Sequence, residues 1–171
     1  MQMKFVYEET VLRYKDMVYR IAFAQCSCRE DAEDVFQDVF LKLYKQLENQ
    51  KNGSDFFESE EHLKSWLIRV TLNCCKLLRR SAWFRTRAEL NENIPDKNDG
   101  YPSDSENGEV VAAVKALPEK YRPAVMMFYY EDMSCAEIAA ALEMNEATVR
   151  TRLKRARERL KKSLKEMWND E

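Results

Sequence analysis

The sequence predicts an all-α protein with two small helical domains joined by a flexible acidic linker. Only three glycines and four prolines occur among its 171 residues, and both residue types weaken helix interiors. Apolar residues recur at helical spacing on both sides of the centre of the chain. Residues 86–108 interrupt this periodicity with two prolines and two glycines among Asn, Asp, Ser and Glu, which is linker composition.

The first domain, residues 1–85, is expected to contain three helices. The first spans residues 9–25, where apolar side chains repeat at helical spacing before a polar break. The second spans residues 31–47. It begins with acids and carries Lys42 and Lys45 near its end, an order that complements the helix dipole.

Two apolar rows run along this second helix, although a surface helix needs only one. The extra width indicates deep burial or a partner surface. The rows are Val35, Val39, Leu43 and Leu47, and Phe36, Phe40 and Tyr44. A polar loop at 48–61 precedes a third helix at 62–80, and three helices can close one small core. The inward side of the third helix is predicted to carry Leu63, Trp66, Leu67, Val70, Cys74 and Leu77.

The second domain, residues 109–171, begins with two predicted helices. Val110, Val114 and Leu117 mark a short helix that ends at Pro118. A further helix is expected at 119–131. Pro123 lies inside this range, so a local bend is expected there.

The rest of the second domain has the plan of a helix-turn-helix unit. Ser134 and Glu137 form a capping box that opens a short helix. Glu143 and Met144 make a tight connection, and Asn145 can cap a last helix that continues to about residue 167. A capped short helix, a turn and a capped basic helix together favour DNA binding.

The net charge of -2 conceals a strong asymmetry. Residues 145–165 hold nine Lys or Arg against two Glu, and residues 76–87 hold five bases and no acid. Residues 88–109 hold seven acids against one Lys. The basic stretches indicate polyanion partners, although a charge run taken alone is more typical of a solvated helix face.

In a helix-turn-helix the first turns of the second helix face base edges in the major groove. Here the side chains off the apolar row can bond bases or phosphates. These candidates are Thr148, Arg150, Thr151, Lys154 and Arg155. The competing interpretation is a plain helical hairpin with a solvated face.

Three runs of the sequence resemble the extracytoplasmic-function (ECF) type of RNA polymerase sigma factor. Residues 117–160, LPEKYRPAVMMFYYEDMSCAEIAAALEMNEATVRTRLKRARERL, are similar to the fourth conserved region of that family. Residues 31–44, DAEDVFQDVFLKLY, are similar to the second region, where the factor binds polymerase. Residues 62–80, HLKSWLIRVTLNCCKLLRR, are similar to the adjoining segment that melts the start-proximal promoter element.

The resemblance implies an alternative sigma factor that binds core RNA polymerase and directs promoter-specific transcription initiation. The polymerase clamp of the β′ subunit would be met by Asp34, Gln37, Asp38 and Phe40, and the β flap is a second implied contact. Basic residues Lys76, Arg79 and Arg80 would hold the melted strand, and residues 49–61 would hold a flipped base. Arg150, Thr151, Lys154 and Arg155 would read the minus-thirty-five element. An anti-sigma partner is also implied. Leu77 departs from the family, which often has Asp or Asn there.

Two other classes of function are weighed against this one. A stand-alone dimeric regulator with the same helix-turn-helix would bind a palindrome without polymerase. An enzyme would need a site such as the cluster Glu58, Glu60, Glu61 and His62, but no phosphate-binding glycine loop or nucleophile elbow accompanies it. No cofactor, metal site, small-molecule substrate or membrane insertion is expected, and the predicted location is the cytoplasm.

Overall fold

The computed structural model describes residues 5–26, 28–50, 56–88 and 108–169. These residues form seven α-helices and no strand, as the sequence predicted. The chain divides into two compact units, Met1–Pro95 and Asp96–Glu171. The predicted linker, 86–108, overlaps the helices at both its ends, and its residues 89–107 lie outside the described part of the chain. Each unit is therefore considered by itself.

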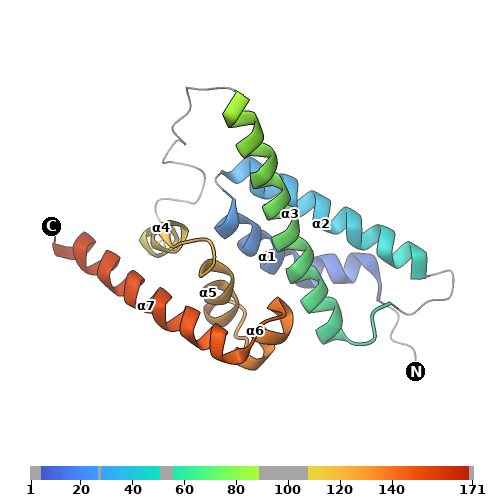
Figure 1. The fold of residues 1–171 in the computed structure, drawn as a ribbon. Coiled ribbons are helices and arrows are strands. Elements are labelled where there is room, and N and C mark those ends of the chain that lie inside the picture. The colour runs from blue at the N-terminus through green and yellow to red at the C-terminus, as the bar shows by residue number, and fades with distance from the viewer. Residues whose placement is uncertain (1–4, 27, 51–55, 89–107, 170–171) are drawn as a thin grey trace. The chain divides into compact units, whose positions relative to one another are not determined.

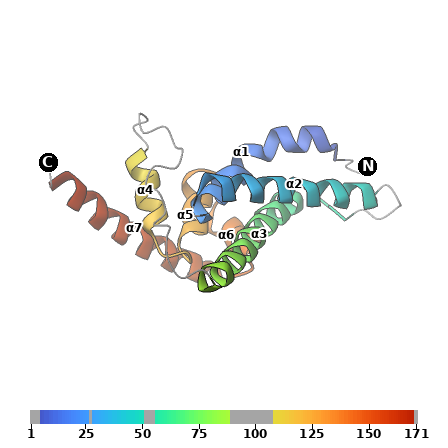
Figure 2. The same cartoon turned by 90° about the horizontal axis from the view of Figure 1, so that it is seen from above.

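Unit 1 is a bundle of α1 (Tyr7–Gln25), α2 (Arg29–Gln50) and α3 (Glu60–Ala88). Each helix contacts the other two, and α3 crosses α1 and α2 (Figures 1 and 2). The helices are longer than expected. In particular, α3 continues eight residues past the predicted end, because no glycine or proline follows until Pro95.

The core of unit 1 is built from branched aliphatic side chains of all three helices. The largest fully buried members are Val18, Ile21, Val35, Val39, Leu43, Leu63, Leu67 and Ile68. The aliphatic row predicted for α2 is thus confirmed. The aromatic row is divided: the ring of Phe36 packs 4.8 Å from Phe40, which is 4% exposed, whereas Tyr44 is 47% exposed. Burial therefore accounts for part of the extra apolar width.

The prediction that Leu77 points inward is wrong, because its side chain is 60% exposed. The buried row of α3 advances in steps of four residues from Leu63 to Leu67, Thr71 and Cys75. Thr71 fits this row because its hydroxyl donates to the Leu67 carbonyl at 2.6 Å. Because Thr71 is polar, the apolar pattern of the sequence does not reveal this buried row.

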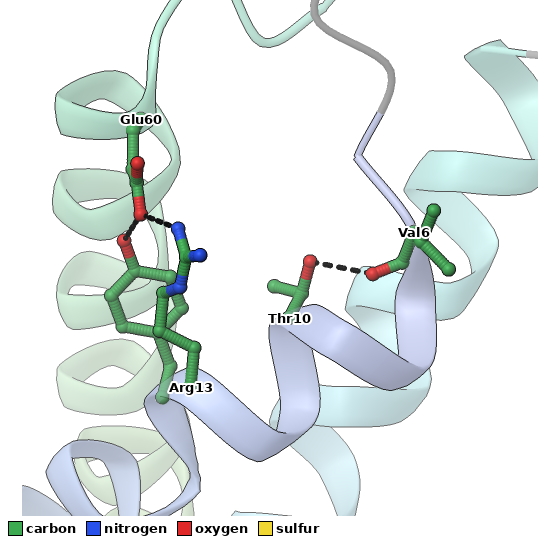
Figure 3. Close-up of polar contacts among 5 residues, drawn as sticks. Val6, Thr10, Arg13 and Glu60 are labelled. Carbon is green, nitrogen blue, oxygen red and sulfur yellow. Dashed lines mark hydrogen bonds and ion pairs between the residues drawn. The ribbon is translucent and has the colours of Figure 1, made fainter.

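Glu60, the first residue of α3, ties this helix to α1. Its Oε1 accepts a hydrogen bond from the Tyr14 hydroxyl at 3.0 Å and an ion-paired hydrogen bond from Arg13 (Figure 3). The bond from Arg13 lowers the pKa of Glu60, and the bond from Tyr14 lowers it further. Burial, together with the bond to Glu60, raises the pKa of Tyr14 to about 12. One turn earlier, the Thr10 hydroxyl donates to the Val6 carbonyl at 2.8 Å (Figure 3).

Unit 2 consists of α4 (Gly108–Ala116), α5 (Arg122–Tyr129), α6 (Cys135–Leu142) and the long α7 (Glu146–Asn169). The three shorter helices all contact α7, which runs past them in Figure 1. The small core includes Leu117, Tyr121, Val125, Met127, Ile138, Val149, Leu153 and Ala156.

The expected bend at Pro123 is wrong, because α5 begins only at Arg122 and its proline lies in the first turn. There the missing N–H has no helical partner to lose. Residues 119–121 instead form a turn, closed by the Tyr121 N–H donating to the Pro118 carbonyl at 3.0 Å. Among the described residues, no helix combines the length and apolarity needed to cross a membrane.

Candidate nucleic-acid interface

The connection between α6 and α7 has the local geometry of a helix-turn-helix. The Ser134 hydroxyl accepts from the Glu137 N–H at 3.1 Å, and the Glu137 carboxylate accepts from the Ser134 N–H at 2.7 Å. This reciprocal pair is the predicted capping box. It satisfies two N–H groups that would otherwise lack partners and so fixes where α6 begins.

A left-handed residue ends α6 and sets the direction of α7. Glu143 has φ 53° and ψ 47°, a conformation that costs a non-glycine residue about 1 kcal/mol. The Met144 N–H donates to the Ala139 carbonyl at 3.0 Å, which satisfies a carbonyl at the end of α6. The tight connection expected at these two residues is therefore present.

The inner face of α7 is apolar and its outer face is cationic. Val149, Leu153 and Ala156 are at most 2% exposed. Four of the five α7 residues predicted to bind DNA are exposed, and Thr148 is half-buried. The exposed four are Arg150, Thr151, Lys154 and Arg155. The side chains that could reach bases thus lie on α7 opposite its packed face.

Local partners already orient two of these side chains. Arg150 forms an ion pair with Glu146 one turn earlier, which raises the pKa of the guanidinium. The Thr151 hydroxyl donates to the Ala147 carbonyl at 2.9 Å. Arg152, which the sequence reasoning passed over, donates to the Lys120 carbonyl at 3.2 Å. Arg152 lies one turn after Thr148 on α7, and this spacing could have identified it from the sequence as a further residue of the same surface.

In unit 1, the acidic and amide candidates on α2 form part of its exposed face, but Phe40 does not. Asp34, Gln37 and Asp38 are exposed. Phe40 is 4% exposed and packs against Phe36 inside the bundle. Phe40 is therefore part of the packed interior of unit 1, and its contact with polymerase stays a prediction.

The basic candidates on α3 lie along its outer side. Lys76 and Arg80 are exposed, as is Leu77 between them. Arg79 is half-buried and donates to the Gln25 side chain at 3.5 Å, at the end of α1. A hollow of about 230 Å³ lies between α2 and α3, lined in part by Asp38, Lys42 and Leu77.

The start of α3 carries an aromatic cluster that the sequence had divided between loop and helix. The ring of Phe57, which is 3% exposed, lies 5.3 Å from Trp66 and 5.8 Å from His62. Phe56 packs on the same rings and remains 40% exposed. Residues 51–55 of the predicted base-holding loop lie outside the described part of the chain.

The cluster that an enzyme would require has other roles here. Glu60 is bonded to Arg13 and Tyr14, while the His62 Nδ1 accepts from the Glu58 N–H at 3.4 Å. In the described ranges, no three His, Cys, Asp or Glu side chains lie where they could share a metal ion. These contacts serve the start of α3.

Comparisons with known proteins agree with both halves of the chain. The family model "Sigma-70 region 2" matches residues 10–85, and the model "Sigma-70, region 4" matches residues 107–160. The chain is 29% identical over 167 residues to the ECF RNA polymerase sigma factor SigE of Mycolicibacterium smegmatis, covering 91% of this chain and 60% of that protein. It is 24% identical to SigW of Bacillus subtilis, covering 90% of this chain and 86% of SigW.

Two solved structures share the fold. The sigma factor RpoE of Bartonella quintana, solved with the anti-sigma factor NepR, has a TM-score of 0.75 at 20% identity and covers 93% of this chain and 96% of its own. CnrH, solved with the cytosolic domain of CnrY, has a TM-score of 0.63 at 24% identity and covers 93% of this chain and 87% of its own.

Proposed function

The chain belongs to the sigma-70 family as an ECF-type alternative sigma factor that directs transcription initiation, and on this premise we propose how its two units divide that work. Residues 1–85 bind the polymerase clamp and the minus-ten element. Residues 109–171 bind the minus-thirty-five element. The acidic linker predicted between these two parts joins them. The observation that carries the proposal is the occurrence of both regions, in order, with a capped helix-turn-helix in the second.

For unit 2, the support comes from the two faces of α7. A helix that buries Val149, Leu153 and Ala156 must present the opposite side to solvent. That side carries Arg150 and Lys154, which suit base edges and phosphates in the major groove. The capping box and the left-handed Glu143 fix the angle at which this helix leaves α6.

For unit 1, the support comes from exposed polar groups on a rigid bundle. Asp34, Gln37 and Asp38 offer acceptors to the clamp of the β′ subunit, while Lys76 and Arg80 offer cations to the melted strand. Aromatic rings near a single-stranded segment provide stacking surfaces, and Phe56 is an exposed ring within the predicted base-holding loop.

The partners of the proposed function are core polymerase, at its clamp and β flap, promoter DNA, and an anti-sigma factor. Both structural neighbours were solved with an anti-sigma factor or a cytosolic partner domain. The cytoplasm, where polymerase works, is the proposed location. We further propose that the chain acts as a regulator without catalysis.

A run-off transcription assay tests this function. The full chain is added to sigma-free core polymerase with a library of promoter fragments, and defined transcripts are expected only when both are present. Tight protection of a symmetric operator by the chain alone, without any start-site selection, would replace the proposal with the dimeric regulator.

The clamp assignment has its own test. The double variant Gln37→Ala with Asp38→Ala should weaken binding to core polymerase while the circular dichroism spectrum and the melting temperature stay unchanged. Both side chains are exposed, so the fold does not depend on them. Lys45→Ala on the same helix, also exposed, is the control that should retain polymerase affinity. Normal affinity in the folded double variant contradicts the assignment.

A further inference from the structure

A hollow of about 370 Å³ lies beside the first turns of α7, where the turn before α5 meets that helix. Its lining from the turn is Lys120 and Tyr121, and its lining from α7 is Ala147, Thr148, Thr151, Arg152 and Arg155. Three of these residues are cationic and none is acidic. The positive end of the α7 dipole adds to the same potential. A small space bounded by converging cations is suited to an anion.

Tyr121 is the buried residue among those that line this hollow, and it contacts the cations around it. Its side chain is only 3% exposed, and its ring lies 5.0 Å from the Lys120 Nζ and 5.7 Å from the Arg159 Cζ. Burial acts to raise the pKa of the phenol, but hydrogen bonds with Arg155 and Lys120 outweigh it, so the pKa of Tyr121 lies below its usual value. The side chain of Tyr121 therefore interacts with three cations, Lys120 from its own turn and Arg155 and Arg159 from α7.

The backbone of the turn is fixed to α7 as well. Arg152 donates to the Lys120 carbonyl at 3.2 Å, and this bond uses one of the five N–H groups of a guanidinium. The Thr151 hydroxyl is already engaged with the Ala147 carbonyl, so the strongest donors that line the hollow are those of the cations Lys120, Arg152 and Arg155. Charge-assisted donors of this kind are typical of phosphate sites.

The occupant follows from the position of the hollow. It shares Thr151 and Arg155 with the outer face of α7, so a double helix whose groove holds α7 would bring its backbone to the same place. We propose, on the basis of the proposed function, that the hollow binds one backbone phosphate of promoter DNA, with Tyr121 as the residue that positions Arg155 and Lys120 for it. Arg155 then holds the backbone, whereas Arg150, which faces Glu146, stays with the bases.

Salt dependence distinguishes this site from a structural role. Holoenzyme made from the full chain and core polymerase is bound to a promoter fragment that the wild type selects, at several salt concentrations. Loss of one phosphate contact should reduce the slope of log affinity against log salt by about 0.9. Lys120→Gln should do this and lower affinity by about five-fold. The loss should be equal on promoters with different upstream sequences.

Tyr121→Phe keeps the ring and removes the hydroxyl, so it should reduce the salt slope in the same direction. Lys165→Gln, an exposed lysine nearer the C-terminal end of α7, is the matched control and should leave the slope unchanged. An unchanged slope in folded Lys120→Gln overturns the phosphate site, even if transcription by the wild type is normal. A wild-type holoenzyme that selects no promoter overturns the proposed function, and this site with it.

Discussion

The two units differ in how their charged side chains are paired. In unit 1 the ion pairs join neighbouring elements or turns, as Arg13 does with Glu60 and Arg29 with Glu33. In unit 2 three cations surround Tyr121 with no carboxylate among the residues that line the hollow. Unit 2 also contains one ion pair within α7, between Arg150 and Glu146. The contrast therefore lies in the hollow, where the cations have no carboxylate among the residues around them, whereas Arg13 and Arg29 are each paired with one.

The cores of the two units also differ in the helices and side chains that build them. Unit 1 encloses branched aliphatic side chains from three long helices, all in contact with one another. Unit 2 packs three short helices on one long helix, and its core combines aliphatic side chains such as Ile138 and Leu153 with the small residues Ala139, Ala141 and Ala156. Small side chains allow α6 to approach α7 closely, so the geometry of the turn sets the position of α7. Four predictions test this contrast, from the largest expected effect to the smallest.

Leu67→Ala should destabilise unit 1 by about 2 to 5 kcal/mol, because a fully buried leucine leaves a cavity when truncated. Denaturant unfolding measures the loss. Leu12→Ala, at a position 67% exposed, is the control and should change stability little. Amide exchange in α6 and α7 should stay as in the wild type. Equal loss of protection there would mean that the units do not unfold separately.

Arg150→Ala should weaken binding to the upstream element by about 1 to 3 kcal/mol if the side chain bonds a base, with a much smaller loss on a shuffled sequence. Arg155→Ala is the comparison and should weaken binding equally on both sequences, because its guanidinium is held at Tyr121. Fluorescence anisotropy of holoenzyme on the two fragments measures the difference. A uniform loss for Arg150→Ala would assign that residue to phosphate.

Ser134→Ala should destabilise unit 2 by about 1 kcal/mol, because it removes the acceptor for the Glu137 N–H. Thr at the same position retains the acceptor, so Ser134→Thr should recover most of the stability. Thermal unfolding followed by circular dichroism measures both variants. Identical curves for Ser134→Ala and the wild type would show that the turn, and not the capping box, fixes α6.

Glu60→Gln should have a small effect that depends on pH. The pKa of Glu60 is lowered in the folded chain, so its ionisation stabilises the fold above the unfolded pKa of about 4.3 and this contribution disappears as pH falls through the folded pKa. The variant should therefore melt below the wild type at pH 7, and the difference should vanish in acid. A difference that grows on acidification would reverse the assigned sign.

Much of the site followed from the sequence because its signals are local. The capping box and the outer cations of α7 depend on spacings of three or four residues, and both lie where expected. The sequence did not reveal that Phe40 is buried within unit 1 or that Leu77 is exposed. Whether each side chain is buried depends on which neighbouring helix packs over it. Helical periodicity indicates the centre of the buried face of a helix but not the width of that face.

From the amino-acid sequence alone it follows that the chain is helical, that it has two parts, and that its last helix carries unbalanced positive charge. Composition, caps and periodicity act over a single turn of helix, so they can be read without knowing the fold. Tertiary structure alone decided that Glu60 ties α3 to α1 and that Tyr121 gathers Lys120 and Arg155 around one hollow. Except for the contact between the neighbours Lys120 and Tyr121, these contacts join residues more than thirty positions apart, and only the packing of helices brings such residues within hydrogen-bonding distance.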